Sequence, residues 1–247
     1  MQLSRKIFFL IVIGLVAIGG GCVQHDPKYG VETPTMSPLT RKQTWAVAPM
    51  VNLSGQKSAD SILQADLVFQ QLQQVDGLIV VPVNRVIEVM LSLHIDKINS
   101  EQHAQLICEL LGCDGLIVPT ITIYDPYNPP KLGAALQLFV RSPASLTKQA
   151  NFNLREFARQ PSAKSAAATS GGSMLQVVGM FDSQNGSVRT ALERYAKGRN
   201  DPMGPMGARE YLIVMDRYCG FVWHLLIVDM ISTPKFRQMA ATVSDAK

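Results

Sequence analysis

The sequence predicts an α/β fold: a mixed sheet flanked by helices, with an added antiparallel hairpin and a long C-terminal helix. Three segments are apolar at nearly every position, which is typical of strands buried on both faces: Trp45 to Val51, Leu78 to Val83 and Leu116 to Tyr124. The segments between them carry apolar residues at helical spacing. Alternation of this kind predicts a sheet with helices packed on it.

Three helices are expected between these strands. Ser58 is placed to cap the first, Asn84 the second and Ser100 the third, and Gly112 suits the left-handed position after the third. The first helix is expected to bury one apolar stripe, formed by Ile62, Ala65, Phe69, Leu72 and Val75. Its glutamines are expected to face solvent, namely Gln64, Gln70, Gln71 and Gln74.

The pattern changes after the third strand. A strand over Leu132 to Arg141 follows a turn-rich loop and predicts an antiparallel hairpin. Residues 142–173 are low in apolar bulk and are expected to form a mobile insertion. The remaining predicted elements are a strand over Leu175 to Asp182, a helix over Ser187 to Lys197, one long helix over Ala208 to Ile231 and a tail over 233–247. The long helix is apolar on most sides, which predicts burial in its own fold or, as an alternative, against a partner.

The N-terminus has the layout of an export signal. Arg5 and Lys6 precede the uncharged segment Ile7 to Ile18, and three glycines then lead to Cys22. A membrane-spanning helix needs about 20 apolar residues, so cleavage is favoured over a permanent span. The Gly-Gly-Gly-Cys sequence resembles the lipobox of bacterial lipoproteins, although an aliphatic residue stands one place further from the cysteine than usual. An ordinary secretion signal and an uncleaved anchor are the alternatives.

Lipidation at Cys22 implies a definite organisation of the chain. Residues 1–21 would be the signal peptide, 22–43 a flexible tether and 44–232 a single α/β domain. Acyl chains such as palmitate contribute about 0.8 kcal/mol per buried methylene and would hold the protein to a lipid bilayer. The expected location is the cell envelope, on the periplasmic face of the outer membrane.

Charge gives no sign of a nucleic-acid partner. The chain has 23 Lys and Arg residues against 19 Asp and Glu residues. Loss of Arg5 and Lys6 with the signal would leave a net charge of about +2. The basic residues are scattered and form no stripe with aromatic residues, so nucleic-acid binding is not expected.

Three cysteines remain besides Cys22: Cys108, Cys113 and Cys219. An odd number leaves at least one free thiol in an exported chain. Their spacing matches neither a zinc knuckle nor a redox pair with two intervening residues. Packing in the core is the favoured interpretation of all three, and a bridge from Cys108 or Cys113 to Cys219 is the alternative.

No catalytic or cofactor motif is present in the sequence. The four histidines, His25, His94, His103 and His224, form no metal-ligand pattern, and phosphate-loop and nucleophile-elbow motifs are missing. Carboxylates such as Asp60, Asp66, Glu88 and Asp114 lie far apart in the sequence. We therefore expect no cofactor, no metal and no enzymatic activity.

The segment Trp45 to Gly55, WAVAPMVNLSG, resembles the opening strand and turn of TolB N-terminal-like domains in bacterial envelope lipoproteins, including the LpoB and CsgG types. The segment Leu111 to Thr122, LGCDGLIVPTIT, resembles a later helix end and strand of that family. Met50 stands where the family usually has phenylalanine. The resemblance covers about Thr44 to Val140 and implies an α/β domain used for protein contacts, without catalytic residues.

The favoured function is therefore a non-catalytic lipoprotein that binds an envelope protein. The loop after the third strand is the candidate contact, because tyrosine and proline present rigid amphipathic surface; its residues are Tyr124, Asp125, Pro126, Tyr127, Pro129 and Pro130. An ordinary hairpin loop is the other interpretation of this segment. The alternative functions are an oligomeric secretion or pore component of the CsgG type and an enzyme whose site the sequence does not reveal.

Overall fold

The computed structural model describes residues 35–141, 174–197, 199 and 204–245. The predicted signal, Cys22, His25 and the predicted insertion at 142–173 lie outside these residues. The elements in chain order are β1 (Gln43–Val47), β2 (Val51–Asn52), α2 (Ser61–Gln73), β3 (Leu78–Val81), α3 (Val83–Leu93), α4 (Glu101–Leu111), β4 (Gly115–Asp125), β5 (Lys131–Val140), β6 (Met174–Asp182), α7 (Gly186–Ala196), the 3₁₀ turn η2 (Gly207–Arg209), α8 (Glu210–Ile213), α9 (Met215–Ser232) and α10 (Pro234–Asp245).

The strands form one mixed sheet in the order β3-β1-β4-β5-β6, and β2 pairs with β4 as well. β1 runs parallel to both β3 and β4, whereas β4, β5 and β6 are successively antiparallel. This arrangement confirms the predicted mixed α/β sheet with an added antiparallel hairpin. The first predicted strand is divided in two, because the chain leaves β1 after Val47 and pairs again only at Val51.

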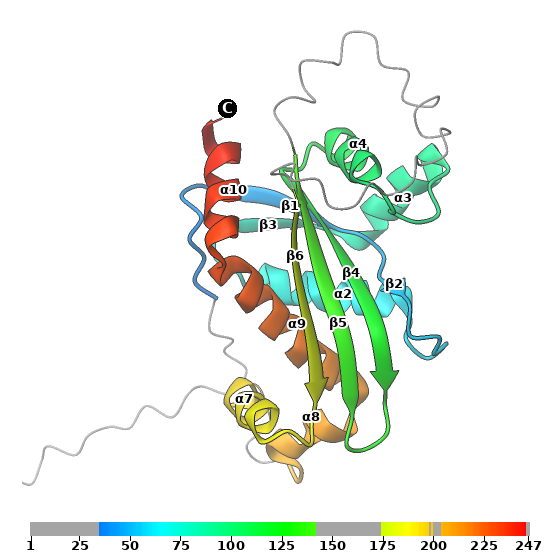
Figure 1. The fold of residues 1–247 in the computed structure, drawn as a ribbon, viewed down its shortest axis with the longest axis vertical. Coiled ribbons are helices and arrows are strands. Elements are labelled where there is room, and N and C mark those ends of the chain that lie inside the picture. The colour runs from blue at the N-terminus through cyan, green and yellow to red at the C-terminus, as the bar shows by residue number, and fades with distance from the viewer. Residues whose placement is uncertain (1–34, 142–173, 198, 200–203, 246–247) are drawn as a thin grey trace, which may run out of the picture.

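Helices cover the two faces of the sheet unequally (Figure 1). α2 and α9 pack on one face with Ile117 of β4 and Leu136 of β5, in the larger of two apolar cores. α3 and α4 pack on the other face with Leu116 and Val118, in a smaller core at one end of the sheet. Neighbouring residues of β4 thus enter opposite cores, as the period of two in a strand requires.

The helix ends follow the predictions in part. Ser100 caps α4 through a 3.2 Å bond from the backbone N–H of His103, and Gly112 ends it at φ 64°. The cap of α2 is Asp60 rather than Ser58, because its carboxylate accepts the N–H groups of the first turn at 2.8 Å. Asn84 lies inside α3, whose N-cap is Pro82, so the predicted cap at Asn84 is wrong.

Two glutamines of α2 lie on the opposite face from the one predicted. Gln64 and Gln71 are buried, whereas Ile62 is exposed. α9 crosses this side of α2, and the two amides accept hydrogen bonds from aromatic side chains of the C-terminal half. The assignment of both glutamines to solvent is therefore wrong.

The segment after residue 206 contains more helices than the single one predicted there. The expected helix over Ala208 to Ile231 is interrupted at Val214, whose extended backbone separates α8 from α9 by a bend of 97°. The predicted tail contains α10, and Phe236 of that helix packs edge-on against Trp45 with ring centroids 5.7 Å apart. α9 itself is mostly buried against α2, β5 and β6, which confirms that it packs within its own fold.

The domain also begins earlier than expected. Thr35 bonds to the end of α2, its N–H donating to the carbonyl of Gln74 at 2.7 Å. Leu39 packs against the larger core. The last part of the predicted tether, from residue 35 to residue 43, is therefore part of the folded structure.

Candidate partner-contact surface

One end of one sheet face has no described helix packed over it. This end holds the last residues of β4, the first residues of β5 and the last residues of β6. α3 and α4 cover that face only near the start of β4 and the end of β5, so the other ends of β4, β5 and β6 lie open in Figure 1. The border is a side-chain pair in which the amide of Gln137 donates to Oε1 of Gln176 at 3.3 Å. We call the region beyond this pair the open face; its residues are Thr120, Thr122, Ile123, Gly133, Ala135, Val178 and Met180.

Strand register places these residues in rows across three strands. Thr120 lies opposite Ala135, which lies opposite Val178. In the next row Gly133 separates Ile123 from Met180. Residues directly opposite in antiparallel strands point to the same side, so the rows form one surface.

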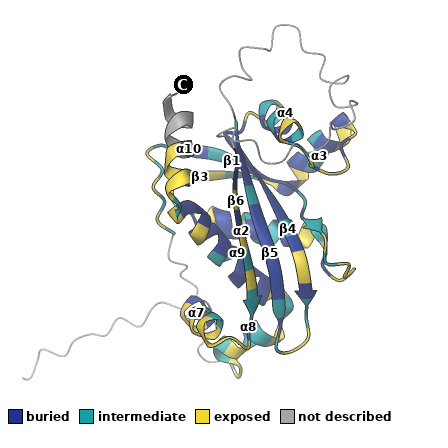
Figure 2. Ribbon diagram, viewed as in Figure 1, coloured by how far each residue is buried: buried dark blue, intermediate teal, exposed yellow. Residues whose placement is uncertain are grey.

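The outer strand of the open face, β6, carries its most exposed apolar side chains. Val178 is 64% exposed and Met180 is 61% exposed, although their strand neighbours Leu175 and Val177 are buried on the other side. Figure 2 shows exposed residues on β6 and on the lower part of β4. Large apolar side chains gathered on an exposed sheet face are a feature of interaction surfaces.

The centre of the open face is flat because β5 contributes only small residues to it. A Cβ at Gly133 would lie 2.8 Å from Oγ1 of Thr122 and 3.1 Å from Cβ of Ile123. These two side chains therefore stand beside the glycine, where a register shift interrupts the ladder between β4 and β5. A β-bulge of this kind brings two residues of one strand opposite a single residue of its neighbour.

The hairpin loop predicted as a contact adjoins the open face. Tyr127 is 80% exposed, and its backbone N–H donates to Oδ1 of Asp125 at 3.2 Å, so the carboxylate stabilises the turn. Beyond the loop, Lys131 and Asp182 form a 3.0 Å ion pair between β5 and β6. The hydrogen bond from the backbone of Gln184, together with Lys131, lowers the pKa of Asp182.

The six predicted contact residues are not equally accessible. Tyr124 and Pro130 are buried, and burial raises the pKa of Tyr124 to about 12. Asp125, Pro126 and Pro129 are half-buried, with a cis peptide bond between Asn128 and Pro129. Tyr127 alone among the six belongs to the exposed residues. Tyr124 and Pro130 are part of the core and not of a contact surface.

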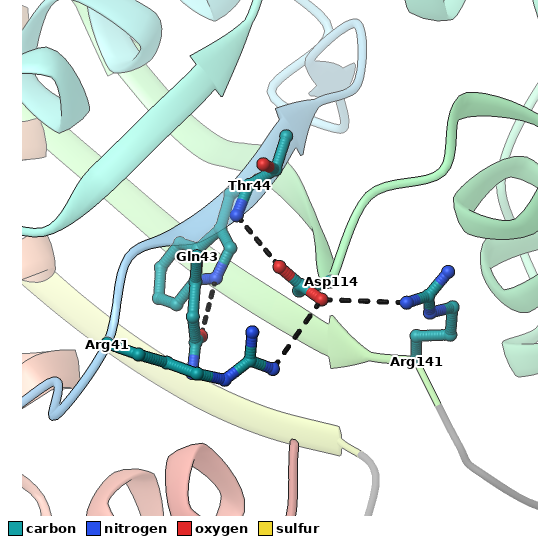
Figure 3. A network of polar contacts seen from close by, with 6 residues as sticks. Arg41, Gln43, Thr44, Asp114 and Arg141 are labelled. Atoms are coloured by element: carbon teal, nitrogen blue, oxygen red, sulfur yellow. Dashed lines mark hydrogen bonds and ion pairs between the residues drawn. The ribbon is translucent and has the colours of Figure 1, made fainter. Parts of the chain in front are cut away.

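Asp114 lies in a buried polar network at the other end of the sheet (Figure 3). Its Oδ2 accepts the backbone N–H of Thr44 at 3.0 Å, and Oδ1 lies 3.9 Å from Arg41 and 3.6 Å from Arg141. The backbone N–H of Asp114 donates to the carbonyl of Thr44 at 2.7 Å. The carboxylate thus joins the segment before β1, the start of β4 and the end of β5, which is a structural role.

The other acidic candidates lie apart from Asp114. The carboxylate of Asp60 caps α2, and Glu88 pairs with Arg85 of its own helix at 3.1 Å. Among the described residues, no group of three or more His, Cys, Asp or Glu side chains could hold a metal ion. The expectation that the chain is not an enzyme stays a prediction.

The histidines and cysteines are dispersed over the described fold. His94 is the left-handed terminus of α3, with φ 59°. His224 of α9 packs on Tyr195 with ring centroids 4.9 Å apart, and burial, with the nearby Arg199, lowers its pKa to about 4.

Cys108 and Cys113 belong to the smaller core and Cys219 to the larger one, on opposite faces of the sheet. The alternative bridge to Cys219 is therefore wrong, and burial of all three thiols confirms the packing interpretation.

Membrane-spanning potential is limited to one bent helix pair among the described residues. No single described helix has the length and hydropathy to cross a membrane. The pair Gly207–Ile213 and Met215–Ser232 meets these criteria only when its two parts are taken together.

Comparisons with known proteins give structural similarity at low sequence identity. No family model and no curated protein matches the chain. The lipoprotein GNA1162 from Neisseria meningitidis is 15% identical, with 62% of this chain and 92% of that chain covered and a TM-score of 0.35. The C-terminal domain of LpoB from Salmonella enterica is 13% identical, with 42% and 75% covered and a TM-score of 0.33.

A third similar structure is the PelC dodecamer from Paraburkholderia phytofirmans. It is 8% identical, with 63% of this chain and 84% of that chain covered and a TM-score of 0.30. One of these structures is of a protein named as a lipoprotein. Another is of LpoB, one of the types that the sequence of this chain resembles. Identities and TM-scores this low assign neither a family nor a function to the chain.

Proposed function

We propose that this chain is a non-catalytic envelope protein, anchored to the periplasmic face of the outer membrane through acylated Cys22, that binds a protein partner through the open face and the Tyr127 loop. The observation that carries the proposal is the exposure of Val178 and Met180 on a sheet face that no described helix covers. Burial of the exposed part of each side chain would contribute about 1–2 kcal/mol before the costs of association.

The edge position of β6 favours a partner that presents a β-strand. Within the described residues β6 pairs only with β5. Its sequence, MLQVVGMFD, contains neither proline nor lysine, which often protect edge strands from pairing. A strand added here would extend the sheet through backbone hydrogen bonds, while its side chains would contact Val178 and Met180.

Site-specific photocrosslinking in intact cells tests this surface. A photoreactive phenylalanine derivative would replace Tyr127, Val178 or Met180 in turn, and Ile79 in the matched control. Ile79 is an exposed apolar residue on β3, at the opposite edge of the sheet. We expect the three test positions to give the same adduct with one envelope protein and the control to give none.

Other crosslinking results would contradict the proposed surface or favour a different function. Equal adducts from Ile79, or none from the three test positions, would contradict the proposed surface. Adducts between two copies of this chain would favour the oligomeric alternative, which the same edge strand of β6 supports.

The anchor requires a separate test. Cells labelled with a palmitate analogue would express the wild-type chain or Cys22→Ser, and both would be fractionated. We expect labelled, membrane-bound wild-type protein and an unlabelled variant that leaves the membrane fraction, because loss of the acyl chains removes the buried methylenes that hold it there. An unlabelled wild-type protein would contradict lipidation without affecting the crosslinking result.

A further inference from the structure

Cys108 and Cys113 are brought together by the way α4 ends. Gly112 adopts a left-handed conformation, and the backbone N–H of Cys113 donates to the carbonyl of Cys108 at 3.0 Å. This six-to-one bond is the defining bond of a Schellman motif, in which side chains at these two positions commonly touch. The motif therefore places the two cysteines side by side although four residues separate them.

The two thiols are in direct contact. Their side chains hydrogen-bond to each other, and both residues are fully buried in the smaller core between α4 and the sheet. A disulfide needs Cα atoms within about 7 Å and side chains that point toward each other, and a backbone bond together with a thiol contact meets both requirements.

The fold allows a disulfide between Cys108 and Cys113 but not one from either of them to Cys219. Cys219 lies in the larger core on the opposite face, so the sheet separates it from both thiols. The bond between the thiols and burial raise the pKa of Cys108, whereas the bond from Cys108 lowers that of Cys113. Arg141 favours the thiolate at both positions.

We propose that Cys108 and Cys113 form an intramolecular disulfide when the chain folds in an oxidising compartment. The oxidant is a disulfide, RS–SR, of a thiol oxidoreductase or a small molecule. The thiolate of one cysteine attacks one sulfur and releases RS⁻, and the thiolate of the other then attacks Sγ of the first and releases the second RS⁻. The two protons of the cysteines pass to the released thiolates, so two RSH molecules leave with one new disulfide.

The bridge would stabilise the turn that carries Asp114. That residue directly follows Cys113, and its carboxylate and backbone join the segment before β1 to the ends of β4 and β5. Because both thiols are buried in the folded chain, oxidation would take place before α4 packs on the sheet. The inference needs an oxidising compartment and does not depend on the partner surface.

Peptide mass spectrometry tests the proposal without interference from the other cysteines. Trypsin cleaves after Lys97 and Lys131 and releases residues 98–131, which contain both thiols and no other cysteine. The full-length chain would be reduced, unfolded, refolded with oxidised and reduced glutathione, and blocked with N-ethylmaleimide. The chain recovered from the envelope of expressing cells would be blocked in the same way.

We expect this peptide to be unlabelled and two hydrogen atoms lighter than the dithiol, and to gain two labels after reduction. Cys219→Ser should leave the result unchanged, whereas Cys108→Ser should leave one labelled thiol at Cys113. Two labels before reduction in the refolded chain, or a bridge from either thiol to Cys219, would overturn the proposal. If the envelope sample alone carried two labels, formation of the disulfide in the cell would be disproved.

Discussion

The indole N–H of Trp223 in α9 donates a 2.9 Å hydrogen bond to Oε1 of Gln64 in α2. Both side chains are almost fully buried. A second bond of the same kind joins the hydroxyl of Tyr195 to Oε1 of Gln71 at 3.1 Å. A buried N–H or O–H without an acceptor is costly, so these two bonds fix the position of the C-terminal half on α2.

The first prediction concerns Gln64. Gln64→Leu should lower the free energy of unfolding by about 1–3 kcal/mol, because it leaves the buried indole N–H of Trp223 without an acceptor. Urea unfolding followed by tryptophan fluorescence measures the change. Gln70→Leu, on the exposed side of the same helix, is the control and should stay within about 0.5 kcal/mol of wild type. Equal losses in both variants would contradict the role of the hydrogen bond.

The buried glutamines show where a sequence pattern misleads. Periodicity places polar residues in water unless a second element covers them. Here α9 covers α2, and the donor to Gln64 lies 159 residues further along the chain. No local signal marks such a pairing. The apolar strands, the Ser100 cap and Gly112 were predictable because each depends on neighbours in the sequence.

The second prediction concerns Asp114. Asp114→Asn keeps an oxygen for the N–H of Thr44 but removes the charge that faces Arg41 and Arg141. We expect a loss of about 1–3 kcal/mol in the free energy of unfolding, less than for a wholly buried pair because both arginines are partly exposed. Urea unfolding measures the change. Because the carboxylate is buried, salt should weaken these ion pairs only slightly. A variant as stable as wild type would exclude a net contribution from them.

The third prediction concerns the flat centre of the open face. Gly133→Ala places a Cβ 2.8 Å from Oγ1 of Thr122, so the β-bulge must shift, at a cost of about 1–3 kcal/mol. Thermal unfolding measures the change. Gly186→Ala, in the first turn of α7 with no neighbouring atom within 4 Å of the added carbon, is the control and should be neutral or slightly stabilising. A neutral Gly133→Ala would show that the bulge adapts freely.

The open face itself was only partly predictable. The hairpin and the exposed Tyr127 follow from turn residues between two apolar strands. Burial of Tyr124 depends on α9, and exposure of Val178 and Met180 depends on where α3 and α4 end on the sheet. The break at Val214 was also hidden, because apolar residues continue at helical spacing through it without proline or glycine. Packing between distant segments determines the burial of Tyr124 and the exposure of Val178 and Met180.

The last prediction concerns the pH dependence of stability. The pKa of His224 is lowered to about 4, from 6.5, chiefly because burial disfavours the imidazolium, and Arg199 adds repulsion. The unfolded chain therefore binds the proton more readily than the folded chain between these two values. The resulting contribution is fully present above pH 6.5 and is lost as the pH falls toward 4. Partial exposure reduces its size to about 1–2 kcal/mol.

The variant His224→Phe separates this contribution from other acid effects. Phenylalanine keeps a ring beside Tyr195 but cannot take up a proton. Urea unfolding of both proteins at pH 7 and pH 4.5 should show that wild type loses about 1–2 kcal/mol more than the variant over this interval. A wild type that loses no more than the variant would show that His224 is readily protonated in the folded chain, so its surroundings would have to admit water.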